Sequence, residues 1–435
     1  MKIAIVGFGL EGQAAYEYWK NSGDITICDI NKVAVPANVK FQSGPAYLDN
    51  IESFDLIVRS PGIRPSELVL AAGTDISSRV TSNTNEFFRV SPTKNIIGIT
   101  GTKGKGTTSS LIAGILENAG KTVHLGGNIG VPPLKLLEAN IGPDDWVVLE
   151  LSSFQLIDCN YSPHIGVCLM VVPEHLDWHY ELNDYFNAKS HLFRHQNKGD
   201  ITVYYADNEN SRRIASIGQG TKIPFFKPPG AYVENDLIKI DGQTLCQTKE
   251  LGLIGAHNWQ NVCAAVTTCW QVSNDPEPIV KTLKTFKGLE HRLEFVAEIG
   301  GAKYFDDSFA TTPEAATVAV DSFPEPKIVI LGGSDKGASY AELAASINNA
   351  DVRSVVLVGD QAERIGRALK RVGFERTSLG GSGMSEIVAQ CVALARPGDV
   401  VLLSPACASF DMFLNYKDRG EQFKRVVLEL ASTRG

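Results

Sequence analysis

The chain has 435 residues, with 41 lysines and arginines against 49 aspartates and glutamates, which gives a net charge of −8. This length exceeds one ordinary hydrophobic core, so we expect about two or three domains. The sequence has no basic run, which argues against nucleic acid or an anionic membrane as a partner, and no apolar run approaches the roughly 18 residues that a membrane span needs.

The eight cysteines are scattered without Cys-x-x-Cys pairs. Most of them, such as Cys168 and Cys263, lie among apolar residues. Reduced thiols in a cytoplasmic protein are the simplest explanation of this distribution. The first residues resemble a short strand that enters a turn rather than a signal peptide.

Residues 1–89 alternate between strand and helix patterns. We expect strands at 2–6, 25–29 and 56–59 and a helix from about 12 to 21, which together form a small parallel α/β domain. The first turn has the Gly-x-Gly-x-x-Gly spacing, and Asp29 closes the second strand where a ribose-binding acid would lie. Any diphosphate can bind such a turn, so the motif indicates a nucleotide site without selecting NAD.

The second domain, expected over residues 90–289, opens with the most informative stretch of the chain. A β-branched run enters a glycine-rich loop, and hydroxyl residues then open a helix: Gly101-Thr102-Lys103-Gly104-Lys105-Gly106-Thr107-Thr108. Glycines let backbone N–H groups close on oxyanions, a lysine neutralises charge, and a hydroxyl group can ligate Mg²⁺. The strict phosphate-loop pattern is not met, because Ile99 replaces its first glycine and Gly106 follows the lysine. We favour phosphate binding over a tight turn that only feeds a helix.

Two more strand patterns follow, at residues 145–150 and 165–172. A buried parallel strand that ends in a carboxylate places that acid at the carboxyl edge of the sheet, near the loop. Glu150 is therefore a candidate Mg²⁺ ligand. The alternative is a strand-end carboxylate that faces water.

Residues 290–435 alternate again, with apolar strands at 327–331, 354–358 and 400–403. They predict a third α/β domain. Residues 332–337 and 404–409 each follow such a strand directly, so both segments should be loops at one sheet edge. The sequence shows no fixed-period repeat and no disordered linker, and we expect the three domains to be in close contact.

Several segments together, in their order and spacing, resemble the Mur ligase family: residues 100–108, 126–130, 150–156, 174–177, 255–261, 291–294 and 404–411. Within that family, ELSSFQL at 150–156 and LLSPACASFD at 402–411 look most like the members that add D-glutamate. The resemblance covers essentially the whole chain, as far as Tyr416. It implies an α/β protein with three domains: an N-terminal Rossmann-like UDP-binding domain, a central P-loop ATPase-type domain and a C-terminal Rossmann-like domain.

The resemblance implies an ATP-dependent ligase that adds D-glutamate to UDP-N-acetylmuramoyl-L-alanine in peptidoglycan precursor synthesis. ATP phosphorylates the terminal carboxylate of the precursor, the amino group of glutamate attacks the acyl phosphate, and ADP and phosphate are released. Two anions must meet in this reaction, so cations have to screen their repulsion. The implied partners are small molecules only, the implied location is the cytoplasm, and a monomer is our default expectation.

The family pattern also implies the residues of the reaction centre. The catalytic residues would be Lys105, Glu150, His175 and Lys189, and Mg²⁺ would be held by Thr107, Glu150, His175 and a carbamoylated Lys189. Carbamoylation needs a neutral amine, hence a pKa lowered by burial or nearby cations. Without the family pattern, Lys189 would be interpreted as a solvated helix lysine. A lone His175 would be interpreted as a packed or surface imidazole, but beside Glu174 and Asp177 at a strand end we favour a ligand.

Three sets of ligand-binding residues follow from the same pattern. ATP would be bound by Gly101, Thr102, Lys103, Gly104, Lys105, Gly106, Thr107, Thr108, Asn258, Asn261, Arg292 and Asp307. The UDP precursor would be bound by Gly9, Leu10, Glu11, Asp29, Ser60, Asn128, Ser152 and Gln155. Glutamate would be bound by Thr311, Lys336, Ser409 and Tyr416. Simpler alternatives stay open, namely helix capping for the asparagines and an ion pair with Glu290 or Glu294 for Arg292.

The sequence departs from the family pattern at a few positions. Gly106 replaces a hydroxyl residue, Glu174 replaces an aspartate, and Phe309 replaces a lysine. The pair Ile30-Asn31 replaces the Thr-Arg expected after Asp29, although Lys32 is a further candidate for uridine contacts. These departures leave the amino-acid preference and the uridine contacts open.

Three other functions remain as alternatives. A nicotinamide-dependent oxidoreductase could be built on the first glycine turn, but it leaves the phosphate loop, Glu150 and His175 unexplained. A folylpolyglutamate synthase is suggested by residues 104–107, but about 90 residues with their own nucleotide-like turn precede this loop. A catalytically silent relative is disfavoured because Lys105, Glu150, His175 and Lys189 are all present.

Overall fold

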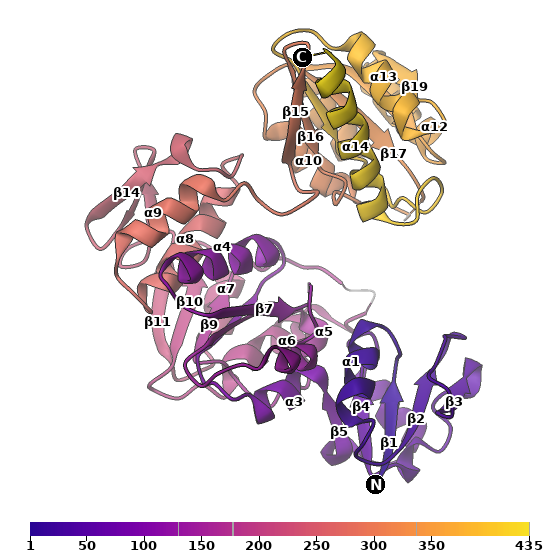
Figure 1. The fold of residues 1–435 in the computed structure, drawn as a ribbon, viewed down its shortest axis with the longest axis vertical. Helices are drawn as coiled ribbons and strands as arrows, with labels where there is room; N and C mark the ends of the chain where they lie inside the picture. The colour runs from indigo at the N-terminus through magenta and orange to yellow at the C-terminus, as the bar shows by residue number, and fades with distance from the viewer. Residues whose placement is uncertain (129, 176–177, 336, 435) are drawn as a thin grey trace. The chain divides into compact units, whose positions relative to one another are not determined.

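The computed structural model describes residues 1–128, 130–175, 178–335 and 337–434 (Figure 1). Contacts divide the chain into two compact units. The first unit is Met1–Leu251 with His257–Phe286, and the second is Gly252–Ala256 with Lys287–Gly435.

The first unit begins with a parallel five-stranded sheet in the order β3-β2-β1-β4-β5 (Figure 1). Its strands are β1 (Lys2–Val6), β2 (Asp24–Asp29), β3 (Lys40–Ser43), β4 (Leu56–Arg59) and β5 (Val80–Ser82). The central β1 is buried from Ile3 to Val6, because helices cover both faces of a parallel sheet. The predicted strands at 2–6, 25–29 and 56–59 are confirmed. The short β3 and β5 carry too few apolar residues to be recognised from their pattern.

The helices of this first sheet are α1 (Leu10–Trp19), α2 (Pro65–Ala72) and α3 (Asn83–Val90). Helix α1 begins two residues before the predicted start, because the glycine turn leads directly into it. A Cβ on Gly12 would lie 2.0 Å from the carbonyl oxygen of Gly7, so the last glycine of the motif lets the helix approach the turn.

The second sheet of the first unit is parallel and six-stranded, in the order β11-β10-β9-β6-β8-β7. Its strands are β6 (Ile96–Thr100), β7 (Val123–Gly127), β8 (Trp146–Glu150), β9 (Ile165–Cys168), β10 (Ile201–Tyr205) and β11 (Thr221–Phe225). After β6 the chain adds β7 and β8 on one side and β9 on the other. The strand order therefore reverses at the carboxyl end of β6, where open α/β sheets bind ligands.

Helices cover both faces of the second sheet. They are α4 (Lys105–Asn118), α5 (Ser153–Leu156), α6 (Leu182–Arg194), α7 (Glu209–Ala215), α8 (Asn258–Trp270) and α9 (Pro276–Thr285). Helices α4, α8 and α9 pack against one another (Figure 1). The strand predicted at 165–172 is too long, because β9 ends at Cys168 and the next residues instead bond to the loop after β6.

A small antiparallel sheet was not predicted. It consists of β12 (Tyr232–Glu234), β13 (Leu237–Ile240) and β14 (Gln243–Gln247). Its two hairpin turns, Asn235-Asp236 and Asp241-Gly242, have positive φ at all four residues. This is the geometry of type I′ turns, which Asn and Asp-Gly favour, so the Asp-Gly pair was a usable signal.

The second unit contains a six-stranded sheet in the order β15-β16-β20-β17-β18-β19. Within the described part of the chain, β15 pairs with β16 in antiparallel orientation, and the other neighbouring strands of this sheet are parallel. The strands are β15 (Glu294–Ile299), β16 (Ala302–Asp306), β17 (Lys327–Gly332), β18 (Val352–Val358), β19 (Thr377–Leu379) and β20 (Val400–Leu403). The helices are α10 (Pro313–Asp321), α11 (Ala341–Asn349), α12 (Ala362–Arg371), α13 (Met384–Leu394) and α14 (Tyr416–Arg434).

The three apolar strands predicted in this unit lie within β17, β18 and β20. The loops after β17 and β20 meet at one edge, as expected, since the N–H of Ser334 donates to the carbonyl of Ala408 at 2.9 Å. A Cβ on Gly333 would lie 2.0 Å from that same carbonyl oxygen, so the close approach requires a glycine.

The cysteines are in the reduced state that the sequence predicted. All eight cysteines fall within the described residues, and they are buried and free of disulfides. Over the described ranges, no helix combines the length and the apolar character that crossing a bilayer requires.

Candidate functional site

The loop between β6 and α4 is shaped by its glycines. Gly101 has a φ of +153° and Gly104 a φ of +85°. A Cβ on Gly101 would lie 2.7 Å from Cβ of Leu169, and one on Gly104 would lie 2.1 Å from Oδ1 of Asn261. Because α4 begins at Lys105, the loop ends at a helix N-terminus whose N–H groups can bind an anion.

Two lysine amines converge on this loop. Nζ of Lys105 donates to the carbonyl oxygens of Gly101, at 3.1 Å, and Thr102, at 3.0 Å. Nζ of Lys189, on α6, donates to the same Gly101 carbonyl at 2.9 Å. The Lys189 side chain is 2% exposed, and its Nζ lies 4.6 Å from the centre of the Tyr185 ring. Lys189 is therefore not the solvated helix lysine of the simpler interpretation.

Burial is the main reason that the pKa of Lys189 falls well below its ordinary value, and the charge of Lys105 lowers it further. Nearby carboxylates, Glu174 and Glu150, act in the opposite direction but less strongly. A lysine amine in this environment is held neutral more readily than one in water. This is the state that reaction with CO₂ requires.

The segment that follows β9 forms one wall of the loop. The N–H of Thr102 donates to the carbonyl of Met170 at 2.8 Å, and its hydroxyl accepts from the N–H of Val172 at 3.0 Å. The same hydroxyl lies 2.9 Å from the hydroxyl of Tyr185 on α6. Thr102 therefore joins the loop to both neighbouring segments.

Glu150 lies at the carboxyl end of β8, in register with Ile99 of β6. It is 3% exposed, so the alternative of a carboxylate facing water is wrong. The side-chain amide of Asn128 donates to Oε1 of Glu150 at 2.9 Å, and the N–H of Asn128 donates to the Glu150 carbonyl at 2.7 Å. A buried carboxylate beside a phosphate-type loop is a suitable oxygen ligand for Mg²⁺.

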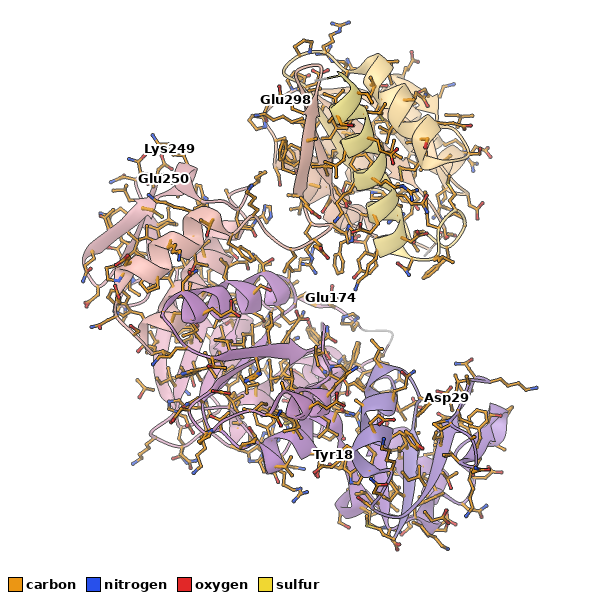
Figure 2. The ribbon with its side chains drawn as sticks, in the orientation of Figure 1. Tyr18, Asp29, Glu174, Lys249, Glu250 and Glu298 are labelled. Atoms are coloured by element: carbon orange, nitrogen blue, oxygen red, sulfur yellow. The ribbon has the colours of Figure 1, made fainter. Side chains whose placement is uncertain are left out.

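His175 lies farther along the segment after β9 and is more exposed. Its backbone φ is +58°, which is unusual for a residue with a side chain, and 44% of the side chain is exposed. Its Nε2 is 3.5 Å from Oε2 of Glu174, which Figure 2 labels. The ring lies 4.8 Å from that of Phe154. Asp177, which follows in the motif, is outside the described residues.

Asn258 and Asn261 are brought to the loop by α8. Neither occupies the N-cap position, which belongs to His257, so helix capping does not explain them. The side-chain amide of Asn261 donates to Oδ1 of Asn258 at 2.9 Å, and its own Oδ1 packs on Gly104. Thr107 and Thr108, on the first turn of α4, are buried in the same region. The predicted nucleotide residues of the first unit thus lie together.

The glycine turn of the first sheet is held by two predicted precursor residues. The hydroxyl of Ser60 donates to the carbonyl of Gly7 at 2.7 Å. Oδ2 of Asp29, labelled in Figure 2, accepts from the N–H of Phe8 at 2.7 Å, and its Oδ1 accepts from Asn31 at 2.8 Å. One carboxylate oxygen of Asp29 thus holds the glycine turn, and the other fixes the residues that follow β2. Gly9 is the N-cap residue of α1, and Leu10 is 72% exposed.

Three more of these residues interact with one another. Ser152 and Gln155 form a capping box at the start of α5, and Nε2 of Gln155 donates to Oε1 of Glu11 at 2.7 Å. Burial raises the pKa of Glu11 to about 7. A groove of about 730 Å³ lies nearby, between α1 and two loops, and Leu10, Val35 and Lys135 are among its lining residues.

In the second unit, one aromatic ring links two predicted ligand-binding residues. The guanidinium of Arg292 lies 3.9 Å from the centre of the Phe309 ring, and that ring makes an edge contact with Tyr416 at 5.1 Å. Thr311 donates its N–H to the carbonyl of Phe309 at 2.8 Å. Ser409 is buried, and Lys336 lies outside the described residues.

Asp307 is buried beside this group. Its Oδ2 accepts from the Ser404 hydroxyl at 2.7 Å, and its Oδ1 accepts from the N–H of Leu293 at 3.2 Å. Burial outweighs these bonds and raises the pKa of Asp307 to about 7. The residue is consequently neutral in part of the population near neutral pH.

Sequence reasoning missed a buried support beneath these loops. Nδ1 of His291 lies 2.7 Å from Oδ2 of Asp306. Although burial alone would lower it, the bond and charge of Asp306 raise the pKa of His291. Nε of Arg419 donates to the Ser308 hydroxyl at 2.9 Å, and Nη2 donates to the carbonyl of Cys407 at 3.2 Å. Although His291 begins the segment 291–294, no local motif predicts these contacts, because most of the partners are distant in sequence.

The parallel α/β sheets, with a glycine-rich loop at a strand-order reversal, define a multi-domain α/β protein that is suited to small anionic ligands. Two family models match the sequence. The Mur ligase middle domain matches residues 99–269, and the glutamate ligase domain of Mur ligases matches residues 291–407.

Curated relatives match over almost the whole chain. A UDP-N-acetylmuramoylalanine–D-glutamate ligase of Pelotomaculum thermopropionicum is 36% identical over 453 residues, which cover 99% of this chain and 98% of that protein. The enzyme of the same name from Clostridium tetani is 35% identical over 448 residues, with 99% and 97% covered. The chain therefore belongs to the Mur ligase family.

Solved structures support the same fold at lower identity. The UDP-N-acetylmuramate-alanine ligase MurC of Thermotoga maritima covers 100% of both chains with a TM-score of 0.61 and 18% identity. MurF of Acinetobacter baumannii covers 99% of this chain and 93% of its own, with a TM-score of 0.63 and 15% identity.

Proposed function

We propose that this protein is an ATP-dependent ligase that joins D-glutamate to UDP-N-acetylmuramoyl-L-alanine and releases ADP and phosphate. The observation that carries the proposal is the match over 99% of the chain to relatives that are named for this reaction. The glycine-rich loop supports it, because Lys105 and the helix N-terminus offer positive charge to the phosphates of ATP, while the buried Lys189 beside them is suited to carbamoylation.

We assign the roles to three domains with boundaries at 1–89, 90–289 and 290–435. The first would be a Rossmann-like domain for the UDP precursor, which the order β3-β2-β1-β4-β5 supports. The second would be a P-loop ATPase-type domain, supported by the loop at the end of β6. The third would be a Rossmann-like domain for the amino acid. The first two share one compact unit, so a boundary at residue 89 would separate functions rather than compact units.

In the proposed reaction, an oxygen of the precursor carboxylate bonds to the γ-phosphorus of ATP and the bond to ADP breaks. The glutamate amine then attacks the acyl carbon, and the C–O bond to phosphate breaks. Lys105 and the N–H groups of the loop bind and orient the phosphates. Asn258 and Asn261, with Arg292 and Asp307 of the second unit, would bind the rest of the nucleotide. Each group acts by position and charge, the main sources of catalysis in phosphoryl transfer.

The residues present fit Mg²⁺. Glu150 offers a buried carboxylate held by Asn128, Thr107 offers a hydroxyl on the first turn of α4, and His175 is an exposed imidazole at the same sheet edge. Bound Mg²⁺ would neutralise phosphate charge. Carbamoylated Lys189 would complete the ligands, and its burial and lowered pKa support that assignment.

For the precursor, we propose the glycine turn with Gly9, Leu10 and Glu11, the neighbouring Asp29 and Ser60, and the residues Asn128, Ser152 and Gln155. The groove beside Leu10 has a volume suited to a ligand of nucleotide size. For glutamate, we propose Thr311, Lys336, Ser409 and Tyr416. We further propose a cytoplasmic monomer, the location being supported by eight buried thiols.

The experiment that tests the function is ADP release with UDP-N-acetylmuramoyl-L-alanine, ATP and Mg²⁺, in which D-glutamate is compared with L-glutamate. We expect release that depends on D-glutamate. Preference for L-glutamate would shift the assignment to a related ligase with another amino acid. An absence of release with any amino acid would favour a catalytically silent relative.

A further inference from the structure

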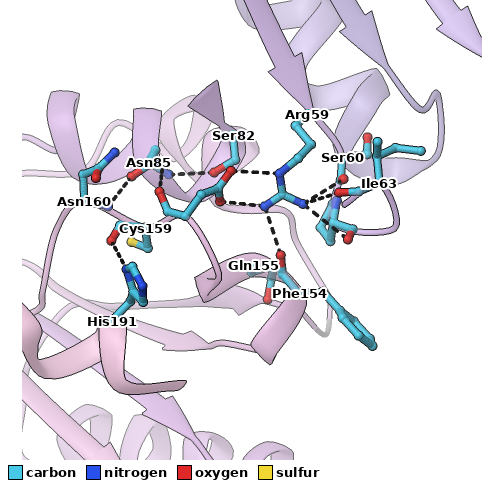
Figure 3. A network of polar contacts seen from close by, with 12 residues as sticks. Arg59, Ser60, Ile63, Ser82, Asn85, Phe154, Gln155, Cys159, Asn160 and His191 are labelled. Atoms are coloured by element: carbon cyan, nitrogen blue, oxygen red, sulfur yellow. Dashed lines mark hydrogen bonds and ion pairs between the residues drawn. The ribbon is translucent and has the colours of Figure 1, made fainter. Parts of the chain in front are cut away.

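Arg59 is a large charged side chain with no exposed surface. It ends β4 and directly precedes residues 60–64, the turn that carries the proposed precursor residue Ser60. Nη1 of Arg59 donates to the carbonyl oxygen of Ile63 at 2.8 Å and to that of Ser60 at 3.2 Å (Figure 3). The guanidinium therefore fixes the path of the turn.

The same guanidinium reaches the second sheet. Its Nε and Nη2 form a bidentate ion pair with the carboxylate of Asp158, at 2.9 and 2.6 Å. Nη2 also donates to the carbonyl of Phe154 at 3.1 Å (Figure 3). Phe154 lies on α5, which begins three residues after Glu150. The Arg59 side chain thus connects the turn at residues 60–64 to α5, the helix that follows the proposed metal ligand Glu150.

A second set of contacts holds the same turn. Nε1 of Trp178 donates to the carbonyl of Gly62 at 3.2 Å, and the hydroxyls of Tyr180 and Ser66 lie 3.0 Å apart. The guanidinium of Arg64 lies over the rings of Trp178 and Tyr180, at 5.6 and 5.0 Å. These aromatic residues follow His175 by three and five positions.

The apolar packing is also continuous. Ile3 and Ile5 of the first sheet belong to the same buried cluster as Leu149 of the second sheet and Leu156 of α5. The two sheets therefore share a core as well as the polar contacts of Arg59. Hydrophobic packing is non-directional, whereas these hydrogen bonds fix how the turn and α5 are oriented.

We infer that Arg59 is a positioning residue, which holds the turn at residues 60–64 against α5 so that a precursor bound to the first sheet presents its carboxylate at the phosphate loop. This inference rests on the proposed function. Arg59 has its donors directed to protein carbonyls and to Asp158, so it acts through the turn rather than on the substrate. Misplacing one reactant by a small distance reduces productive encounters sharply.

The test is Asp158→Asn, which keeps the size of the side chain but leaves the Arg59 charge without its counter-ion. We expect the KM for UDP-N-acetylmuramoyl-L-alanine to rise by about tenfold or more, with the KM for ATP within about twofold of the original value. Arg59→Lys, which keeps the charge without the bidentate geometry, should give an intermediate rise.

The matched control is Asp399→Asn. It removes a similar bidentate pair, with Arg353 at 2.8 and 3.0 Å, from the second unit. The control should lower the Tm as Asp158→Asn does, because each leaves a charge without its partner, but it should leave the precursor KM unchanged. Equal precursor effects in both variants would overturn the positioning role.

A second measurement separates this inference from the proposed function. Hydrogen exchange without substrate should speed up at residues 60–64 and 152–158 together in Asp158→Asn, whatever reaction the enzyme catalyses. If exchange is faster in Asp158→Asn but the original protein shows no turnover, the proposed function is wrong and the inference about Arg59 stands. Unchanged exchange at residues 60–64, or a parallel rise in both KM values, would overturn the inference.

Discussion

At the scale of single residues, Lys105 and Lys189 both donate to the carbonyl oxygen of Gly101, and this contact matters most for the proposed reaction. Burial and the charge of Lys105 favour a neutral Lys189, so the positive charge of Lys105 is concentrated at the end of β6 even without a ligand. This concentration lowers the affinity of the site for protons and raises it for anions. We therefore expect the loop to bind phosphate despite lacking the strict phosphate-loop pattern.

We expect Lys105→Met to lower kcat by about 100- to 1,000-fold, because a preorganised cation at a transferring phosphate is worth that much. Steady-state ADP release measures the loss, and circular dichroism checks that the fold persists. The control is Lys121→Met, which changes an exposed lysine beyond the end of α4 and outside the loop, and it should leave kcat unchanged. A Lys105→Met variant with more than about a tenth of the original rate would remove this lysine from the mechanism.

The buried Asp307 predicts a pH-dependent stability. Its pKa is about 7 in the folded protein and near 3.8 when exposed, so the folded state binds more protons between these values and stability falls as the pH rises through that window. Asp307→Asn removes this dependence. The difference in Tm between the variant and the original protein should therefore favour the variant more at pH 8 than at pH 5.

Thermal unfolding at the two pH values checks this prediction. A Tm difference that is the same at both would mean that Asp307 is ionised throughout. Ser354→Ala, a change at a buried hydroxyl elsewhere in the same sheet, is the control for effects of substitution alone.

At the scale of elements, the sequence predicted several of the apolar strands, although the interior strand β10 was not predicted. The central strands β1, β8, β17 and β20 were recognised because burial on both faces imposes continuous apolar runs. The short edge strands β3 and β5 were missed since their residues are half-exposed. The strand predicted at 165–172 was too long, because the apolar residues after Cys168 serve the phosphate loop rather than the sheet.

The candidate site shows a similar limit. A local motif predicted the loop and Glu150, because each lies where a strand ends. The burial of Lys189 and the contact of Asn261 with Gly104 depend on helices α6 and α8, whose placement no local pattern encodes. The His291, Asp306 and Arg419 support was missed for the same reason.

Gly420 shows how tightly one helix packs on this support. A Cβ at this position of α14 would lie 2.2 Å from Nδ1 of His291 and 2.7 Å from Oδ2 of Asp306. An exposed helical Gly→Ala change normally stabilises by about 0.5–1 kcal/mol, but here the clash should reverse the sign. We expect Gly420→Ala to lower the Tm.

Differential scanning calorimetry measures this change. The matched control is Gly366→Ala on α12, where the nearest contact of the new Cβ is a movable leucine methyl group at 3.1 Å. It should leave the Tm unchanged or raise it. A Gly420→Ala protein as stable as the original would show that α14 is not packed on the His291 and Asp306 pair.

At the scale of the whole molecule, the compact units do not coincide with the three proposed domains. The first two sheets share a core and the Arg59 contacts, whereas the second unit has its own cores. The three proposed roles are thus distributed over two compact units. The strand patterns predicted three α/β domains in close contact, and the first two sheets do pack together in one unit.

The central claim is that ATP phosphorylates the precursor carboxylate, and an isotope experiment tests it most directly. UDP-N-acetylmuramoyl-L-alanine labelled with ¹⁸O in its terminal carboxylate would be turned over with ATP, Mg²⁺ and D-glutamate, and the released phosphate analysed by mass spectrometry. The acyl-phosphate route predicts one labelled oxygen in each phosphate. The amine attacks the acyl carbon, the acyl C–O bond breaks, and the carboxylate oxygen leaves with the phosphate. Unlabelled phosphate, or label in AMP instead, would contradict the account.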